Sequence, residues 1–259
     1  MTEDMELVRD YAARQSENAF ATLVSRHIHL VYSVALRQTR DLHLAEEVTQ
    51  AVFIILARKA KSLGEKTILT GWLYRTVQYA SADALKMQRR RQHREQEACM
   101  QSILNEPVES HVWQQIAPML DAAMLRLGEK DRNAVLLRFF EGKDFKQVGV
   151  ALGANEDTAR MRVNRALEKL RKIFLKRGVN STTAAIAETI SNNSVQSAPA
   201  LLIKTTTAVA LAKGATTSLS IAAIAKATLI TMKTKIVVAT VAVAVYATRI
   251  GARALREKT

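Results

Sequence analysis

Apolar residues recur at three- and four-residue steps through three long stretches of the first hundred residues. This spacing places apolar side chains on one side of an α-helix. The pattern therefore predicts three helices, over residues 18–38, 42–60 and 72–91. Ser16 is a candidate N-cap for the first helix. Between the second and third helices the pattern lapses, and Gly64 and Gly71 predict a loop there.

The second half of the chain predicts four shorter helices, starting near residue 116. Three glycines interrupt them, namely Gly128, Gly142 and Gly153. Asp144 followed three residues later by Gln147 predicts a capping box, and Asn155 is a good N-cap for the last helix. A short capped helix, a glycine turn and a longer helix to about residue 176 are typical of a helix-turn-helix.

The segments outside these helices differ in composition. Residues 92–115 lose the periodicity and include Pro107, which predicts a linker between domains. Residues 181–200 are small and polar, which predicts a second linker, and the alanine-rich residues 205–230 predict a packed or interfacial helix. The expected organisation is a domain at 5–95, a linker at 96–112, a domain at 113–178 and an extension at 179–259.

Composition agrees with an all-α fold, because the chain has only three Pro and nine Gly and 5% aromatic residues. A net charge of +14 indicates a polyanionic partner, either nucleic acid or an anionic membrane surface. Cys99 is the only cysteine, which excludes an intramolecular disulfide. The acidic first residues do not resemble a secretory leader, so we expect a cytoplasmic protein.

The last helix of the helix-turn-helix has a polar, basic face opposite its apolar stripe. Arginine can donate two hydrogen bonds to guanine in the major groove, asparagine can pair with adenine, and flanking cations can hold phosphates. The simpler alternative is a solvated basic face. The candidate DNA-reading residues are Asn155, Asp157, Thr158, Arg160, Met161, Arg162, Asn164, Arg165 and Lys169.

Aromatic residues lie beside an arginine run on the predicted third helix, a mixture that suits unstacked bases and their backbone. The alternative is that Trp72 and Tyr74 belong to the core. Nothing in the sequence indicates an enzyme or a cofactor, since it contains no phosphate-binding loop, nucleophile elbow or HExxH motif. His27 and His29 are two residues apart on a helix and cannot share a metal.

Five blocks of the sequence, in this order and spacing, resemble bacterial sigma-70-type transcription initiation factors of the small extracytoplasmic-function group, over residues 5–177. The blocks are AFATLVSRH (19–27), LAEEVTQAVFIILARK (44–59), GWLYRTVQYASADALKMQRRR (71–91), LRLGEKDRNAVLLRFFEG (125–142) and FKQVGVALGANEDTARMRVNRALEKLR (145–171). The first three resemble sigma region 2 and the last two resemble region 4.

The resemblance implies a region 2-like helical bundle that docks on the clamp of core RNA polymerase and opens the minus-ten element. It also implies that the helix from Asn155 reads the minus-thirty-five element. The implied polymerase-binding residues are Glu46, Glu47, Gln50 and Phe53. The implied minus-ten residues are Trp72, Tyr74, Arg75, Gln78, Tyr79, Arg89, Arg90 and Arg91, next to the loop at 61–71.

The implied partners are core RNA polymerase, promoter DNA and an anti-sigma or other regulatory protein, with no cofactor. Two departures from the family pattern stand out. Gln147-Val148-Gly149 replaces an acid and a small alanine, and Leu42-His43-Leu44 replaces a more acidic entry to the docking helix. A helix-turn-helix regulator acting without polymerase and a membrane-associated basic scaffold are the alternative functions.

The extension contains 13 uncharged residues at 236–248. They span about 20 Å as a helix, short of the ~30 Å hydrocarbon core of a bilayer. Snorkelling by Lys235 and Arg249 lengthens the usable segment, which makes residues 234–252 a candidate membrane helix. The expected consequence is a tether to the inner face of the cytoplasmic membrane, and the alternative is a helix packed on the protein or a partner.

Overall fold

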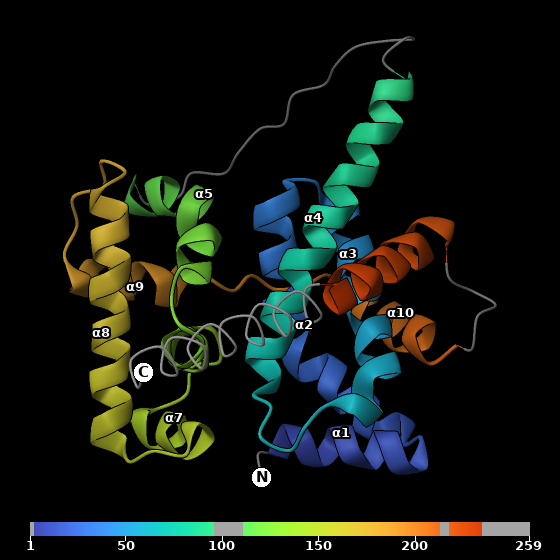
Figure 1. Cartoon of the computed structure of the whole chain (residues 1–259), viewed down its shortest axis with the longest axis horizontal. Coiled ribbons are helices and arrows are strands. Elements are labelled where there is room, and N and C mark those ends of the chain that lie inside the picture. The colour runs from blue at the N-terminus through green and yellow to red at the C-terminus, as the bar shows by residue number, and fades with distance from the viewer. Residues whose placement is uncertain (1–2, 96–110, 213–217, 235–259) are drawn as a thin grey trace, which may run out of the picture.

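A computed structural model describes residues 3–95, 111–212 and 218–234, and all its regular elements are helical (Figure 1). The all-α prediction is therefore confirmed for these residues. The first group of helices is α1 (Glu3–Arg14), α2 (Glu17–Thr39), α3 (Leu42–Lys59), a 3₁₀ turn η1 (Ala60–Ser62) and α4 (Leu69–Glu95). The second is α5 (His111–Leu125), α6 (Glu129–Val135), the π-helical turn η2 (Leu136–Phe140), α7 (Phe145–Leu152) and α8 (Glu156–Leu175).

The extension adds α9 (Thr183–Asn193), α10 (Ala200–Leu211) and a further helix over residues 219–234. The prediction of a linker over residues 181–200 is wrong, because α9 occupies most of it. Ile186 and Ile190, four residues apart, are fully buried, and α9 packs on α8, α5 and η2. The two isoleucines have a helical spacing, although the composition of the segment indicated a linker.

The predicted caps at Ser16 and Asp144 are confirmed, whereas α5 begins at His111 and not near residue 116. The Ser16 hydroxyl accepts from the N–H of Ala19 at 3.2 Å. The Asp144 carboxylate accepts from the N–H of Gln147 at 2.7 Å, while the Gln147 side-chain oxygen accepts from the N–H of Asp144 at 3.0 Å. Each cap satisfies a backbone donor that the first turn of a helix leaves unpaired.

Gly71 lies inside α4 and not in a loop, which corrects the expected start of that helix from residue 72 to Leu69. A Cβ atom at Gly71 would collide with the side chain of Asn133 on α6. The missing side chain therefore allows α4 and α6 to approach closely. At its other end α4 continues to Glu95, because no helix breaker follows residue 91. Of the expected linker, residues 96–110 lie outside the described part of the chain.

The central helix of the first group is α2, which packs on α1, α3, α4, α5 and α10. Phe20, Val24 and Ile28 are completely buried in its core. In the described residues α2 is also the one helix long and apolar enough to cross a membrane, but 67% of that stretch is buried inside the protein. Burial of this kind is what a core helix requires. The candidate membrane helix at 234–252 lies, except for residue 234, outside the described residues.

Candidate nucleic-acid and polymerase interfaces

The helix-turn-helix presents one face of α8 to solvent at the edge of the molecule (Figure 1). Ala159, Val163 and Leu170 are buried beneath it, while Met161 is 66% exposed. The Asn155 side chain accepts from the N–H of Thr158 at 2.8 Å, which caps α8 as predicted. Most of the predicted DNA-reading residues are exposed, and Thr158 and Arg162 are half-buried. This face has the length and polarity that a major-groove helix needs.

The turn before α8 passes close to α7. A Cβ atom at Gly149 would lie 2.8 Å from the carbonyl oxygen of Ala154. Gly153 ends α7 in the left-handed conformation, with φ of 62°, which glycine adopts at little cost. The glycine at 149, one of the departures from the family pattern, therefore permits a tight approach between α7 and the turn.

A buried carboxylate on α6 holds two of the α8 cations, a partner that the sequence had not indicated. Asp131 accepts from Arg165 Nη2 and from Lys169 Nζ, both at 2.7 Å. Burial raises the pKa of Asp131, but the two cations outweigh it and hold the pKa below its usual value. Arg165 and Lys169, both predicted DNA contacts, thus anchor α8 to α6.

Arg160 occupies a different position on α8. Its guanidinium pairs with Glu156 at 3.1 Å and lies 5.1 Å from the centroid of the Phe145 ring on α7. Both partners are local and Arg160 is exposed, so this arrangement holds the side chain at the surface. Arg160 is therefore better placed than Arg165 to exchange its contacts for a base.

The predicted minus-ten residues on α4 do not form one exposed surface. Tyr74 is completely buried, and its hydroxyl donates to Asp121 Oδ1 on α5 at 2.7 Å. Burial and the neighbouring Asp121 carboxylate raise the pKa of Tyr74 well above its usual value. Arg37 on α2 donates to the same carboxylate from Nε at 3.0 Å. These three side chains form a joint between the two helical groups.

The other α4 candidates lie at or near the surface. Arg89 and Arg90 are exposed, and the side chain of Arg91 lies outside the described residues. The half-buried candidates are Trp72, Arg75, Gln78 and Tyr79. α6 packs against α4, and its Asn133 side chain lies against Gly71. Burial lowers the pKa of Arg132 on α6, and the positive charge of Arg75 lowers it further.

The predicted polymerase-binding residues on α3 are divided between surface and core. Phe53 is completely buried, so it supports the helix from inside. Glu46, Glu47 and Gln50 are half-buried, and the extension lies against Glu47 and Gln50. Gln50 Nε2 donates to Thr205 Oγ1 on α10 at 3.3 Å.

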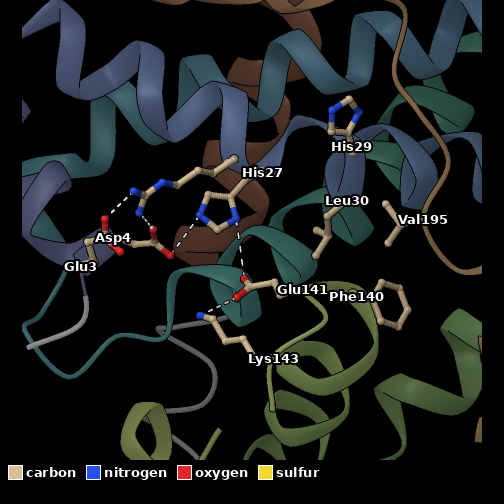
Figure 2. Close-up of a pocket in the computed structure, with 10 residues that line it drawn as sticks. Glu3, Asp4, His27, His29, Leu30, Phe140, Glu141, Lys143 and Val195 are labelled. Atoms are coloured by element: carbon tan, nitrogen blue, oxygen red, sulfur yellow. Dashed lines mark hydrogen bonds and ion pairs between the residues drawn. The ribbon is translucent and has the colours of Figure 1, made fainter. Parts of the chain in front are cut away.

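A cavity of about 370 Å³ lies where α1, α2, the end of η2 and the segment after α9 meet (Figure 2). His27 is buried there, with Nε2 3.1 Å from Asp4 Oδ2 and Nδ1 3.8 Å from Glu141 Oε1. Figure 2 shows His29 turned away from this cluster, and its Nδ1 accepts from the N–H of Ala198 at 2.9 Å. The two histidines therefore do not converge on one point.

The Asp4, His27 and Glu141 side chains suit an ionic clasp better than a metal site. The two carboxylates face opposite nitrogens of one imidazole ring, and each already has a cation, Arg26 at 3.2 Å from Asp4 and Lys143 at 2.7 Å from Glu141. Burial raises the pKa of Asp4, but His27 and Arg26 outweigh it and lower the value to about 2. Glu141 also accepts from Thr70, so the clasp joins the two helical groups.

Comparison with known proteins gives matches over both helical groups. Sigma-70 region 2 matches residues 23–91, and Sigma-70, region 4 matches residues 118–170. RNA polymerase sigma factor CarQ of Myxococcus xanthus is 31% identical over 173 residues, which cover 66% of this chain and 95% of CarQ. ECF RNA polymerase sigma factor SigE of Mycolicibacterium smegmatis is 31% identical, over 63% of this chain and 64% of SigE.

ECF RNA polymerase sigma factor SigW of Bacillus subtilis is 22% identical, over 60% of this chain and 89% of SigW. The solved structure of the sigma factor RpoE with the anti-sigma factor NepR from Bartonella quintana covers 64% of this chain and 98% of that chain, at 18% identity and a TM-score of 0.27. The assignment rests on the sequence matches. They show that the chain belongs to the extracytoplasmic-function group of the sigma-70 family, with regions 2 and 4 followed by an extension that the family does not cover.

Proposed function

We propose how this sigma factor, which directs RNA polymerase to promoters and is not an enzyme, divides that work among its helices. In the proposal α8 reads the minus-thirty-five element, α4 engages the minus-ten element, and α3 docks on the clamp of core RNA polymerase. The observation that carries it is the capped helix-turn-helix with an exposed polar face on α8. The work takes place on DNA, in the cytoplasm.

On α8 the exposed Arg160 and Asn164 are proposed to contact base edges, since arginine and asparagine can each make two hydrogen bonds to a purine in the major groove. Arg162 and Lys169 are proposed to hold phosphates, which fixes the register of the helix without reading the sequence. Of the remaining predicted residues, Asn155 is the N-cap of α8, and Asp157, Thr158, Met161 and Arg165 lie within the helix.

On α4 the proposed minus-ten surface is Trp72, Arg75, Gln78 and Tyr79, with Arg89, Arg90 and Arg91 as phosphate contacts. The Gln78 amide nitrogen is buried with no hydrogen-bond partner among the described residues. A buried donor without a partner is costly, and an unpaired base would supply an acceptor. Tyr74 would join this surface only after the joint with Asp121 opens.

On α3 the proposed polymerase contacts are Glu46, Glu47 and Gln50, with Phe53 supporting the helix from the core. The two acids are the fifth and sixth residues of α3, in its second turn. A cluster of acids on one helix face complements a basic surface on a partner and speeds its encounter.

Transcription reconstituted with core RNA polymerase and a genomic DNA library tests the proposal. Full-length protein is expected to produce start sites that share two upstream boxes. Arg160→Glu with Asn164→Ala should remove promoter-specific starts and leave polymerase binding unchanged, while Lys130→Glu, an equal charge reversal at an exposed α6 position, should leave both unchanged. Unchanged start sites in the α8 variant would refute the reading role of α8, and DNA binding without polymerase would favour a simple regulator.

We also propose two finer features that the resemblance suggests. The first is control by an anti-sigma or other regulatory protein, which copurification with the full chain from its own cells would reveal. The second is a membrane tether through residues 234–252. Fractionation should place the full chain with membranes and a variant with Val238→Asp and Val241→Asp in the soluble fraction, and equal distribution of the two would contradict the tether.

A further inference from the structure

The extension covers the helix that we propose to dock on polymerase. α10 packs on α3 and α2, with Leu202 3% exposed toward them and Leu201 71% exposed on its other side. Thr206, one turn from Leu202, is completely buried. The inner face of α10 is thus fitted to the bundle, while its outer face is free of it.

The helix over residues 219–234 adds to this cover (Figure 1). Ile224 is 2% exposed, and the Ser220 hydroxyl donates to Glu47 on α3. Near the other end of the helix the Thr231 hydroxyl donates to Asp83 on α4, at 3.0 Å from the nearer carboxylate oxygen. Two of the three polar α3 candidates, Glu47 and Gln50, therefore bond to the extension.

The segment before α10 is fastened to α2, so α10 begins at a fixed place. The N–H of Gln196 donates to the Ser33 hydroxyl at 2.6 Å, and the N–H of Ala198 donates to His29 at 2.9 Å. Arg37 donates to the carbonyl oxygen of Ser194. Backbone groups bonded at successive points leave this segment little freedom to move away from the bundle.

Charge also suits the extension to this position. Residues 200–234 contain four lysines and no acidic residue. The acids of α3 are Glu46 and Glu47. Because the extension has no acidic residue in this range, it brings no like charge against them. The Ser220 hydroxyl donates to the carboxylate of Glu47, whose side chain is only 17% exposed.

We propose that residues 200–212 and 218–234 occupy the polymerase-docking surface of α3 and must leave it before core RNA polymerase binds. The proposal rests on the docking role of α3 given above. If the uncovered state is a minor population, the apparent dissociation constant for polymerase is the intrinsic constant divided by that population. Any change that frees the extension then tightens binding without altering a polymerase contact.

Binding of full-length variants to purified core RNA polymerase tests the proposal. Leu202→Asp and Ile224→Asp place a charge in the buried contact and are expected to lower the dissociation constant at least about tenfold. The controls are Leu201→Asp and Ile230→Asp, the same change at positions 71% and 57% exposed on the same helices. They should remain within about twofold of the unchanged chain.

A reversible lock tests the same contact in the opposite direction. Asp83→Cys and Thr231→Cys, with Cys99→Ser to remove the natural thiol, allow a short cleavable crosslinker to hold the extension on the bundle. None of these positions is a proposed polymerase contact. The locked protein should lose polymerase binding, and cleavage of the crosslinker should restore it.

The outcomes separate the two proposals. Tighter binding by the buried-site variants together with loss of binding in the locked protein supports the covering role. If the unchanged chain binds polymerase and neither the variants nor the lock alter that binding, the covering proposal is overturned. The docking proposal then still stands. Absence of polymerase binding by the unchanged chain, the variants and the unlocked protein alike would overturn both.

Discussion

The two DNA-binding regions of this sigma factor differ in what covers them. The α8 face that we propose to read DNA is open, with Met161 and Asn164 in solvent. The faces of α4 and α3 that we propose for DNA and polymerase are partly occupied, because α6 lies against α4 and α10 lies against α3. If the proposed roles of these helices hold, this conformation presents the α8 face while covering the faces proposed for polymerase and for DNA opening. The joint, the clasp and the extension are the contacts that maintain it.

The largest effect is expected at the joint between the groups. Asp121→Ala leaves the buried Tyr74 hydroxyl and the Arg37 guanidinium without their shared acceptor. Removing one partner of a buried ion pair costs about 3–5 kcal/mol. Urea unfolding should show this loss of stability. The control is Glu188→Ala at an exposed position, which should leave the free energy of unfolding nearly unchanged. A loss below 1 kcal/mol would mean that the joint does not hold the groups together.

A smaller effect is expected at the clasp. The pKa of Asp4 is lowered from 3.8 to about 2, so its ionised form stabilises the folded state above pH 4, and this contribution is lost as the pH falls through about 2. Asp4→Asn should therefore cost about 2 kcal/mol at pH 5. The difference between the variant and the unchanged chain should shrink toward pH 2. Thermal unfolding between these pH values measures it, and a difference that grows with acidity would contradict the clasp.

Disturbing the close approach of α4 and α6 is expected to lower the free energy of unfolding by about 1 kcal/mol. Gly71→Ala adds a Cβ that collides with Asn133, and the strain should exceed the gain of about 1 kcal/mol in helix propensity. Adding Asn133→Ala removes the obstacle and should recover the stability. Gly128→Ala is the control, since nothing lies within 4 Å of a Cβ there. If the double variant is no more stable than Gly71→Ala, the contact is not the reason for the glycine.

The smallest effect on stability is expected on the open face. Met161→Ala should change the free energy of unfolding by less than about 0.5 kcal/mol, because most of its side chain is already in solvent. Leu170→Ala, on the buried side of the same helix, should cost about 2–5 kcal/mol. Denaturation of both variants measures how open the α8 face is. A large loss at Met161 would show that this face is covered too.

Local features of this fold could be predicted from the sequence, and distant pairings could not. The caps at Ser16, Asp144 and Asn155 depend on residues at most three positions away, so a short pattern contains them. The pairing of Tyr74 with Asp121 joins residues 47 positions apart, and no periodicity indicates it.

The same distinction applies to the candidate sites. The exposed face of α8 follows from its helical period, but its anchor Asp131 lies 34 residues from Arg165 and was missed. Burial of Phe53 was readable from the apolar stripe, whereas the cover over Glu47 comes from Ser220, 173 residues away. For α9 a signal existed in the spacing of Ile186 and Ile190, although composition pointed to a linker.

The position of the covering helices in the chain also sets an order of events during synthesis. α3 leaves the ribosome long before α10 and residues 219–234, which follow it by more than a hundred residues. At about 5–20 residues per second, the 35 residues from 200 to 234 alone take roughly 2–7 s to make. If the extension competes with polymerase as proposed, a nascent chain with α3 folded and its cover unfinished passes through a period in which polymerase has no competitor. Newly made molecules and completed ones would then differ in activity, although their sequence is the same.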